Sequence, residues 1–247
     1  MMNFPVLLFL PCVFVLWLAA RFGASWQRQR PLKEEERQDF GVVQAAILTL
    51  LALIIGFSFS MATSRYDLRK NYEEAEANAI GTEYVRAGLL PPETAATVRS
   101  QLKKYLELRM LFYRTRSQHE LLRINADTAQ LQDEMWSTVQ APALAQPTPV
   151  MALVVTGMND VLNSQGYTQA AWWNRIPSSA WWLLIATAIC CNLLVGYGTR
   201  ATSKLLVVLP VVISIAFLLI ADIDSPRGGL IHVAAQNLES LYQSLRK

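Results

Sequence analysis

The chain has 247 residues, of which 53% are hydrophobic and 17% are charged, and its formal net charge is +3. Residues 64–147 contain as many acidic as basic side chains, which argues against a nucleic-acid-binding protein because such proteins carry a basic excess. The three cysteines and two histidines show no metal-site spacing, and no nucleophile elbow, P-loop or HExxH motif is present. We therefore expect no metal, no cofactor and no enzymatic activity.

Four segments contain no Asp, Glu, Lys or Arg: Phe4–Ala20, Phe40–Ser64, Ile176–Thr199 and Leu205–Ala221. A helix needs about 20 apolar residues to cross the hydrocarbon core of a bilayer, and its backbone groups must then pair within the helix. The first segment is expected to be a span rather than a signal peptide, because Met1–Asn3 carries no basic side chain. The segments predict an all-α polytopic membrane protein with four transmembrane helices, at about residues 4–20, 41–63, 177–198 and 205–221.

The second apolar segment passes into a charged segment without a helix breaker. Residues 57–80 contain neither Gly nor Pro, and the sequence "AGLLPP" at residues 87–92 supplies a glycine stop followed by prolines. This pattern predicts one continuous helix, roughly Gly41–Ala87. The first half of this helix crosses the bilayer and the second half lies outside it.

Alternating steps of three and four residues place one set of side chains on a single face of this helix. The set consists of Leu53, Phe57, Ser60, Ser64, Asp67, Asn71, Glu74 and Asn78. A helix that faces only lipid has no need of serines in line with an acid, whereas a pore-lining helix does, with an apolar constriction that gates by dewetting. Alternatively, the serines bond to carbonyls one turn earlier and Asp67 pairs with a nearby arginine. The pore-lining candidates are Leu53, Phe57, Ser60, Ser64 and Asp67.

A helical extramembrane region is expected at about residues 64–175. After the first long helix, a second is predicted from "PPETAA" to about Arg116, and a third over roughly Gln118–Gln140. Apolar residues follow one side of each, which predicts an antiparallel hairpin held by Val98, Leu102, Tyr105, Leu106 and Phe112 on one helix and by Leu121, Ile124, Thr128, Leu131, Met135 and Val139 on the other.

The end of this region is rich in proline and tryptophan. Residues 141–149, "APALAQPTP", are predicted to form a proline-broken linker, and 150–163 are apolar enough to pack on the bundle or on the membrane surface. "AAWWNRIPSSAWW", at residues 170–182, is interpreted as the interfacial start of the third span, because tryptophan favours the headgroup layer. Basic residues near the spans are divided too evenly between the two faces to fix the orientation.

Two segments resemble the hallmark sequences of a family. "SRYDLRKNYEEAEANAIGTEYVRAGLLP", which begins at Ser64, and "DIDSPRGGLIHVAAQNLESL", which begins at Asp222, resemble the two hallmarks of the bestrophin-like family of uncharacterised bacterial and plant membrane proteins. The four-span layout extends the resemblance over essentially the whole chain, 1–247, as one membrane domain. The residues that carry it are Arg65, Tyr66, Glu76, Asn78, Gly81, Asp222, Asp224, Pro226, Arg227 and Gly228.

That family is distantly similar to bestrophins, which are pentameric ion channels lined by the second span. Tyr66 and Asp67 match the bestrophin motif beyond this span, although Leu68 stands where bestrophins have arginine. Near the last span, Asp224, Pro226 and Gly228 match, while Arg227 replaces an aromatic residue. The acidic calcium clasp of animal bestrophins has no counterpart.

The resemblance implies a homo-oligomer in the lipid bilayer, a pentamer if bestrophin-like, that passes small inorganic ions. It also implies a multi-pass protein of the bacterial inner membrane with a cytoplasmic middle region. The alternative is a non-conducting membrane scaffold or sensor whose middle helices bind a partner protein.

Overall fold

The computed structural model describes residues 5–199 and 204–246, and these residues form helices and connections without any strand. The described residues do not include residue 4, where the first span is expected to begin, or residues 1–3, whose lack of basic side chains argues against a signal peptide. Three segments of the described residues are long and apolar enough to cross a membrane: Phe9–Gln29, Glu34–Leu89 and Pro149–Gly198. The expected fourth span, α7 (Val208–Asp224), has 17 residues and follows a short 3₁₀ helix, η3 (Lys204–Val207).

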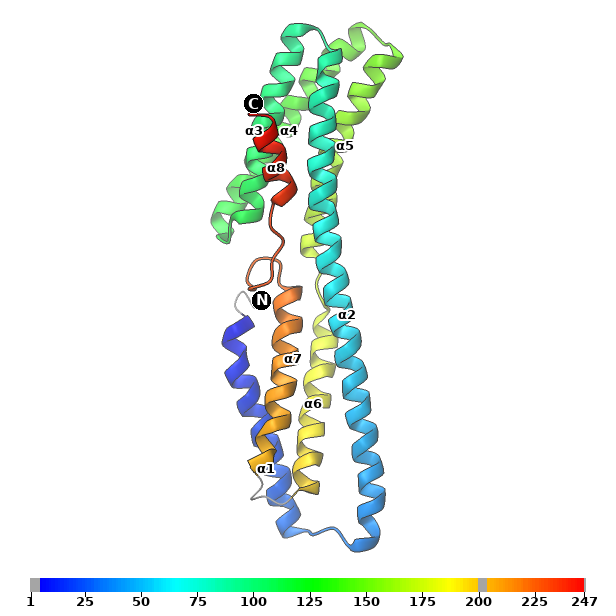
Figure 1. The fold of residues 1–247 in the computed structure, drawn as a ribbon, viewed down its shortest axis with the longest axis vertical. Coiled ribbons are helices and arrows are strands. Elements are labelled where there is room, and N and C mark those ends of the chain that lie inside the picture. The colour runs from blue at the N-terminus through cyan, green and yellow to red at the C-terminus, as the bar shows by residue number, and fades with distance from the viewer. Residues whose placement is uncertain (1–4, 200–203, 247) are drawn as a thin grey trace. The chain divides into compact units, whose positions relative to one another are not determined.

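Helix α2 (Glu34–Arg86) is a single helix of 53 residues, which confirms the predicted continuous helix (Figure 1). It begins with three acidic residues in its first turn, where the helix dipole favours negative charge. It ends where the 3₁₀ helix η2 (Ala87–Leu89) leads into two prolines. The helix contributes to two compact units of the chain, with the boundary between Arg65 and Tyr66.

The first unit comprises residues 1–65 and 175–232 and contains the most apolar helices. It holds η1 (Pro5–Leu8), α1 (Phe9–Gln29), the N-terminal part of α2, α6 (Ser178–Gly198) and α7. Its buried core gathers side chains from all four long helices: Leu16, Leu51, Leu184, Ala188, Cys191, Ile213 and Phe217.

Helices α1 and α6 approach closely because glycine faces backbone at two points. A Cβ atom on Gly23 would collide with the carbonyl oxygen of Leu193, and one on Gly196 would collide with that of Ala20. Small residues commonly allow such close packing between helices in membranes. Tyr197, next to Gly196, donates a hydrogen bond of 2.8 Å to the Arg30 carbonyl oxygen.

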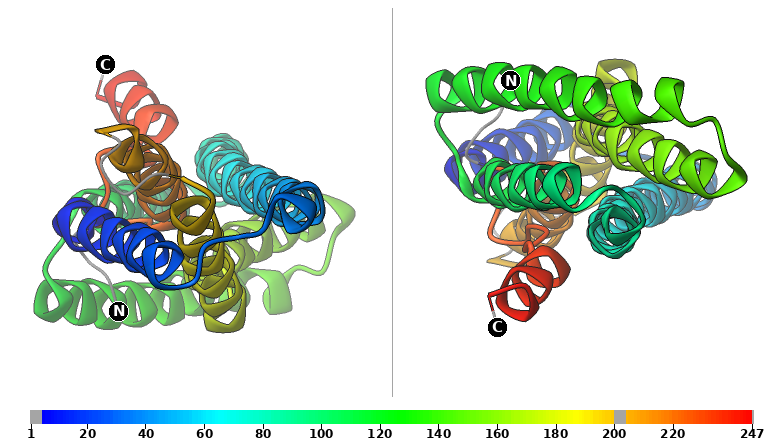
Figure 2. Two further views of the ribbon diagram at one scale, coloured as in Figure 1. Left: turned by 90° about the horizontal axis from the view of Figure 1, so that it is seen from below. Right: turned by 90° about the horizontal axis from the view of Figure 1, so that it is seen from above.

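The second unit comprises residues 66–174 and 233–247 and is a helical bundle. Helices α3 (Pro92–Arg114), α4 (Gln118–Ala145), α5 (Pro149–Trp173) and α8 (Gln236–Ser244) pack with the remainder of α2 in this unit, and Figure 2 shows these helices from two directions. The predicted stripes of α3 and α4 are confirmed: all their members are buried except Leu121, which is half-buried. These stripes pack in one hydrophobic core.

Two local predictions are wrong in part. Residues 141–145 continue α4 instead of forming a linker, because Pro142 lies in the last turn, where it removes only one helical hydrogen bond. Trp172 and Trp173 end α5 rather than starting the third span, and Trp172 is buried among Phe112 and Tyr113, with ring centroids 5.1 and 5.4 Å away. The break before α6 falls at residues 174–177.

Candidate functional site

The side chains that the sequence places on one face of α2 are called the α2 stripe: Leu53, Phe57, Ser60, Ser64, Asp67, Asn71, Glu74 and Asn78. The part of the α2 stripe in the first unit is exposed on the single chain. Leu53 is 53% exposed and Phe57 is 68% exposed, and Ser60 and Ser64 are exposed as well. The opposite side of the helix is buried, at Leu51, Ser58 and Ala62. At 3.6 residues per turn, the helix therefore buries one face and leaves the stripe without a partner inside the unit.

The same division continues on α2 in the second unit. The stripe members Asp67, Asn71, Glu74 and Asn78 are exposed. Buried residues follow the other face of the helix: Arg69, Glu73, Glu76, Ile80, Glu83 and Ala87. Among the described residues, the side chains of Ser60, Ser64 and Asp67 make no hydrogen bond or ion pair, so the stripe has no internal pairing that accounts for its polarity.

Asp224 joins three segments of the first unit at the end of α7. Its carboxylate accepts a hydrogen bond from Arg65 Nη1 on α2 at 3.3 Å and from the backbone N–H of Ile176 at 3.1 and 3.2 Å. Ile176 lies two residues before the start of α6, and Asp224 is 6% exposed. A buried charge with these donors is well compensated, so this acid fixes the start of α6 and the end of α7 against α2.

Asp222 folds the chain back after α7. Its two carboxylate oxygens accept hydrogen bonds of 2.8 Å from the backbone N–H groups of Leu230 and Ile231. A Cβ atom on Gly229 would lie 2.5 Å from the Asp222 carbonyl oxygen, so this turn requires glycine. In the same turn Gly228 donates to the Ser225 hydroxyl at 3.3 Å, and Pro226 is buried while Arg227 is half-buried.

Glu76 connects three helices of the second unit. Its carboxylate forms an ion pair of 2.5 Å with Arg109 on α3 and accepts hydrogen bonds of 3.3 Å from Tyr113 on α3 and Thr168 on α5. Glu76 and Arg109 are both 0% exposed, and the guanidinium lies 4.4 Å from the centroid of the Phe112 ring. Burial, and next the Glu76 carboxylate, raise the pKa of Tyr113, so its hydroxyl remains a donor.

Glu73, one turn earlier on α2, caps the short helix α8. The first N–H groups of α8 have no capping side chain of their own, since Ala235 precedes the helix. Glu73 accepts from the N–H groups of Asn237 and Leu238 at 2.9 and 3.0 Å, and from Asn237 Nδ2 at 2.6 Å. A carboxylate at this position also complements the helix dipole.

The remaining family-motif residues of α2 are placed as follows. Tyr66 is half-buried against the core of the second unit, and Asn78 is exposed as part of the stripe. Gly81 faces α8, because a Cβ atom there would lie 3.1 Å from Leu241 Cδ1. The motif residues with buried carboxylates thus organise the fold, while the pore-lining candidates lie on the free face.

The sequence interpretation identified Glu76, Asp222 and Asp224 but missed Glu73, Glu83, Arg109, Tyr113 and Thr168. A signal for the acids was present, because residues 69, 73, 76, 80, 83 and 87 follow the same three-and-four spacing as the α2 stripe. Charged side chains are mostly exposed in proteins, so this spacing alone does not predict that they are buried.

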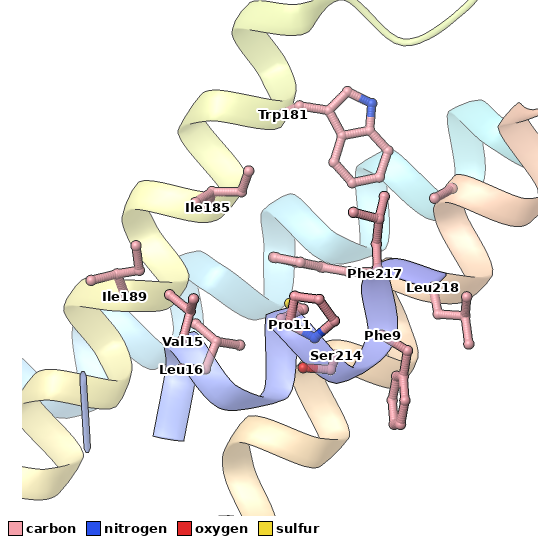
Figure 3. Close-up of a pocket in the computed structure, with 13 residues that line it drawn as sticks. Phe9, Pro11, Val15, Leu16, Trp181, Ile185, Ile189, Ser214, Phe217 and Leu218 are labelled. Carbon is pink, nitrogen blue, oxygen red and sulfur yellow. The ribbon is translucent and has the colours of Figure 1, made fainter. Parts of the chain in front are cut away.

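An apolar pocket of about 330 Å³ lies among α1, α6 and α7 in the first unit (Figure 3). Phe9, Leu16, Trp181 and Phe217 line it, and Ser214 supplies a single hydroxyl. None of the lining residues is charged, and Cys12 is the one possible metal ligand among them. Among the described residues, no group of three His, Cys, Asp or Glu side chains is arranged to hold a metal ion.

The fold matches solved structures of bacterial membrane proteins. A bacterial bestrophin homologue from Klebsiella pneumoniae is 16% identical over 97% of this chain and 96% of its own, with a TM-score of 0.65. A variant of a bacterial bestrophin homologue from the same organism is 17% identical over 98% of this chain and 97% of its own, with a TM-score of 0.67. No curated protein matches this chain.

A family assignment covers nearly the whole sequence. The Bestrophin-like domain matches residues 6–238, which include the first segment whose resemblance was noted from the sequence and all but the last three residues of the second. With its long apolar helices, the chain is an integral membrane protein. It belongs to the Bestrophin-like family.

Proposed function

We propose that this protein is a homo-oligomeric, bestrophin-like ion channel or channel-like membrane protein whose pore is lined by α2. The observation that carries the proposal is the α2 stripe, which is polar over most of its length yet exposed on the single chain, opposite the buried face of the helix. A ring of identical helices around a symmetry axis would place this face toward a wet passage and away from lipid. Family membership and the shared fold support this choice.

The proposed topology has four transmembrane helices: α1, the first part of α2, α6, and α7 with η3. Residues 64–175 then form a helical region outside the bilayer, on the cytoplasmic side. Together they make one membrane domain over residues 1–247, in the bacterial inner membrane. The pentameric state of bestrophins is the expected number of copies.

Along the proposed pore, Leu53 and Phe57 form the apolar constriction and Ser60 and Ser64 the hydroxyl-lined segment beyond it. Asp67 provides one negative charge per subunit at the mouth. A ring of carboxylates attracts cations and repels anions, so small inorganic ions are the expected cargo and Asp67 tunes their selection. No step of this function requires a bound cofactor or a catalytic side chain.

Reversal potentials in a salt gradient test the proposal. Purified protein is reconstituted in planar bilayers, and the wild type is compared with Asp67→Asn and with Glu107→Gln, a control acid that is exposed on α3. Asp67→Asn is expected to shift the reversal potential toward the anion limit, while the control leaves it unchanged. Wild-type currents whose selectivity is the same in all three proteins would contradict the assignment of Asp67.

The alternative, a non-conducting scaffold whose middle helices bind a partner protein, makes a different prediction about assembly. A pore requires several copies, because α2 is the only helix of this chain assigned to the axis. Native mass spectrometry in mild detergent is expected to show a homo-oligomer. A monomer that carries no current would contradict the channel and support the scaffold.

A further inference from the structure

Glu83 lies in a buried seam between α2 and α5, away from the proposed pore face. The residue is 0% exposed, and neither carboxyl oxygen has a hydrogen-bond partner among the described residues. Glu76, two turns earlier on the same face, has three donors. An ionised carboxylate without donors is costly to bury, so this environment favours the neutral acid.

The opposing helix makes room for this carboxyl group. Gly157 on α5 faces it directly, and a Cβ atom at that position would collide with Glu83 Oε2. The same hypothetical Cβ would lie 2.7 Å from Arg86 Nη1. The seam is therefore closed around the Glu83 side chain, with α5 backbone on one side and the Arg86 side chain beside it.

The charged groups around the seam leave Glu83 without an ion pair. Arg86 forms no ion pair with Glu83 in the described part of the chain, and its Nη1 lies 3.4 Å from the Leu153 carbonyl oxygen. Asp160 on α5 is exposed and repels a second negative charge. The basic residues of α3 on this side contact Tyr84, namely Arg99 at its carbonyl oxygen and Lys103 over its ring.

Burial raises the pKa of Glu83 to about 8, with Arg86 lowering it and Asp160 raising it. Glu83 is thus largely protonated at neutral pH and ionises just above it.

We propose that Glu83 is a proton-binding site whose protonation allows α5 to pack against α2, so that loss of its proton loosens this seam. In the loosened state the carboxylate reaches water, where its affinity for a proton is the ordinary one. Closing the seam therefore takes up a proton, and the closed fraction falls as pH rises. The proposal does not depend on whether the protein conducts ions.

Hydrogen–deuterium exchange on the full-length protein in detergent tests the proposal. Exchange of peptides from α2 and α5 around the seam is compared at pH 6 and pH 9 after correction for intrinsic rates. Wild-type protection at the seam is expected to be at least tenfold lower at pH 9 than at pH 6. If opening releases one proton, the equilibrium constant for opening rises up to about tenfold per pH unit at pH values below the pKa of the closed state. Glu83→Gln keeps the shape without the charge and should retain protection at pH 9, whereas Glu74→Gln, on the exposed face, should behave as wild type.

A second measurement covers the case in which Glu83→Gln does not fold. Infrared difference spectra of the wild type between pH 6 and pH 9 are expected to show the loss of one protonated-carboxyl band with a midpoint near that of the seam opening. A wild-type seam whose protection does not depend on pH would overturn the proposal. An equal loss of protection in wild type and Glu83→Gln would overturn it as well.

Discussion

The ion pair between Glu76 and Arg109 predicts a distinctive pattern of stabilities. Both side chains are 0% exposed, and Glu76 also accepts the hydroxyls of Tyr113 and Thr168. Removing one member of a buried pair costs about 3–5 kcal/mol, because the other charge is left uncompensated. Glu76→Met should therefore destabilise the protein by about that amount, which for a chain of this size corresponds to a fall in Tm of roughly 6–20 °C.

Replacing both charges should recover most of this loss. A buried ion pair exchanged for apolar residues of similar volume is often close to neutral in stability. The double variant Glu76→Met/Arg109→Met still leaves the Tyr113 and Thr168 hydroxyls without their acceptor, which costs about 1 kcal/mol each. We expect it to lie roughly 2 kcal/mol below wild type, well above the sum of the single variants.

The assay is thermal unfolding in detergent, followed by circular dichroism, on the two single variants and the double variant. Glu74→Met is the matched control, since Glu74 lies two residues away on the exposed face of α2 and should change Tm little. A Glu76→Met protein within 1 kcal/mol of wild type, or a double variant as unstable as the sum of the singles, would refute the reasoning.

Three further predictions concern other buried contacts. Glu73→Ala removes the cap of α8 and should increase amide exchange over residues 236–244 at least tenfold, with exchange in α4 as the internal control; unchanged α8 protection would show that the cap contributes little. The valine side chain of Gly196→Val should collide with Ala20 and lower Tm or yield, whereas Gly166→Ala, at a position with open space, should not. Equal Tm values for the two variants would contradict the close packing of α1 and α6. Burial raises the pKa of Glu83 from its ordinary value of 4.5 to about 8, so folding binds its proton more tightly and stability falls as pH rises between these values. Glu83→Gln should flatten this part of the profile of Tm against pH, and a profile parallel to wild type would count against the buried carboxyl group.

Much of the fold follows from simple sequence patterns. The uninterrupted segment from Gly56 to Gly81 correctly predicts that α2 is continuous, and the three-and-four spacing correctly predicts the buried faces of α3 and α4. These features are local, because helix continuity and amphipathic periodicity depend on neighbouring residues.

The features that were missed depend on contacts distant in sequence. Helix α8 is capped by Glu73, which precedes it by more than 160 residues, so no local capping signal marks its start. Trp172 is buried because Phe112 and Tyr113 surround it, although its sequence neighbours favour a membrane interface. Likewise, the burial of Glu76 requires Arg109, and the two residues are brought together only by the packing of α3 on α2.

The current carried by Phe57→Ala tests most directly whether α2 lines an ion-conducting pore. Phe57 is 68% exposed on the α2 stripe, and shortening a side chain in a symmetric apolar ring should widen the constriction and raise the current. Phe59→Ala is the matched control, because Phe59 is an exposed phenylalanine on the same helix that lies off the stripe. In planar-bilayer recordings at equal protein amounts, we predict a larger current for Phe57→Ala and a wild-type current for Phe59→Ala. The absence of current in both wild type and Phe57→Ala would contradict the channel assignment.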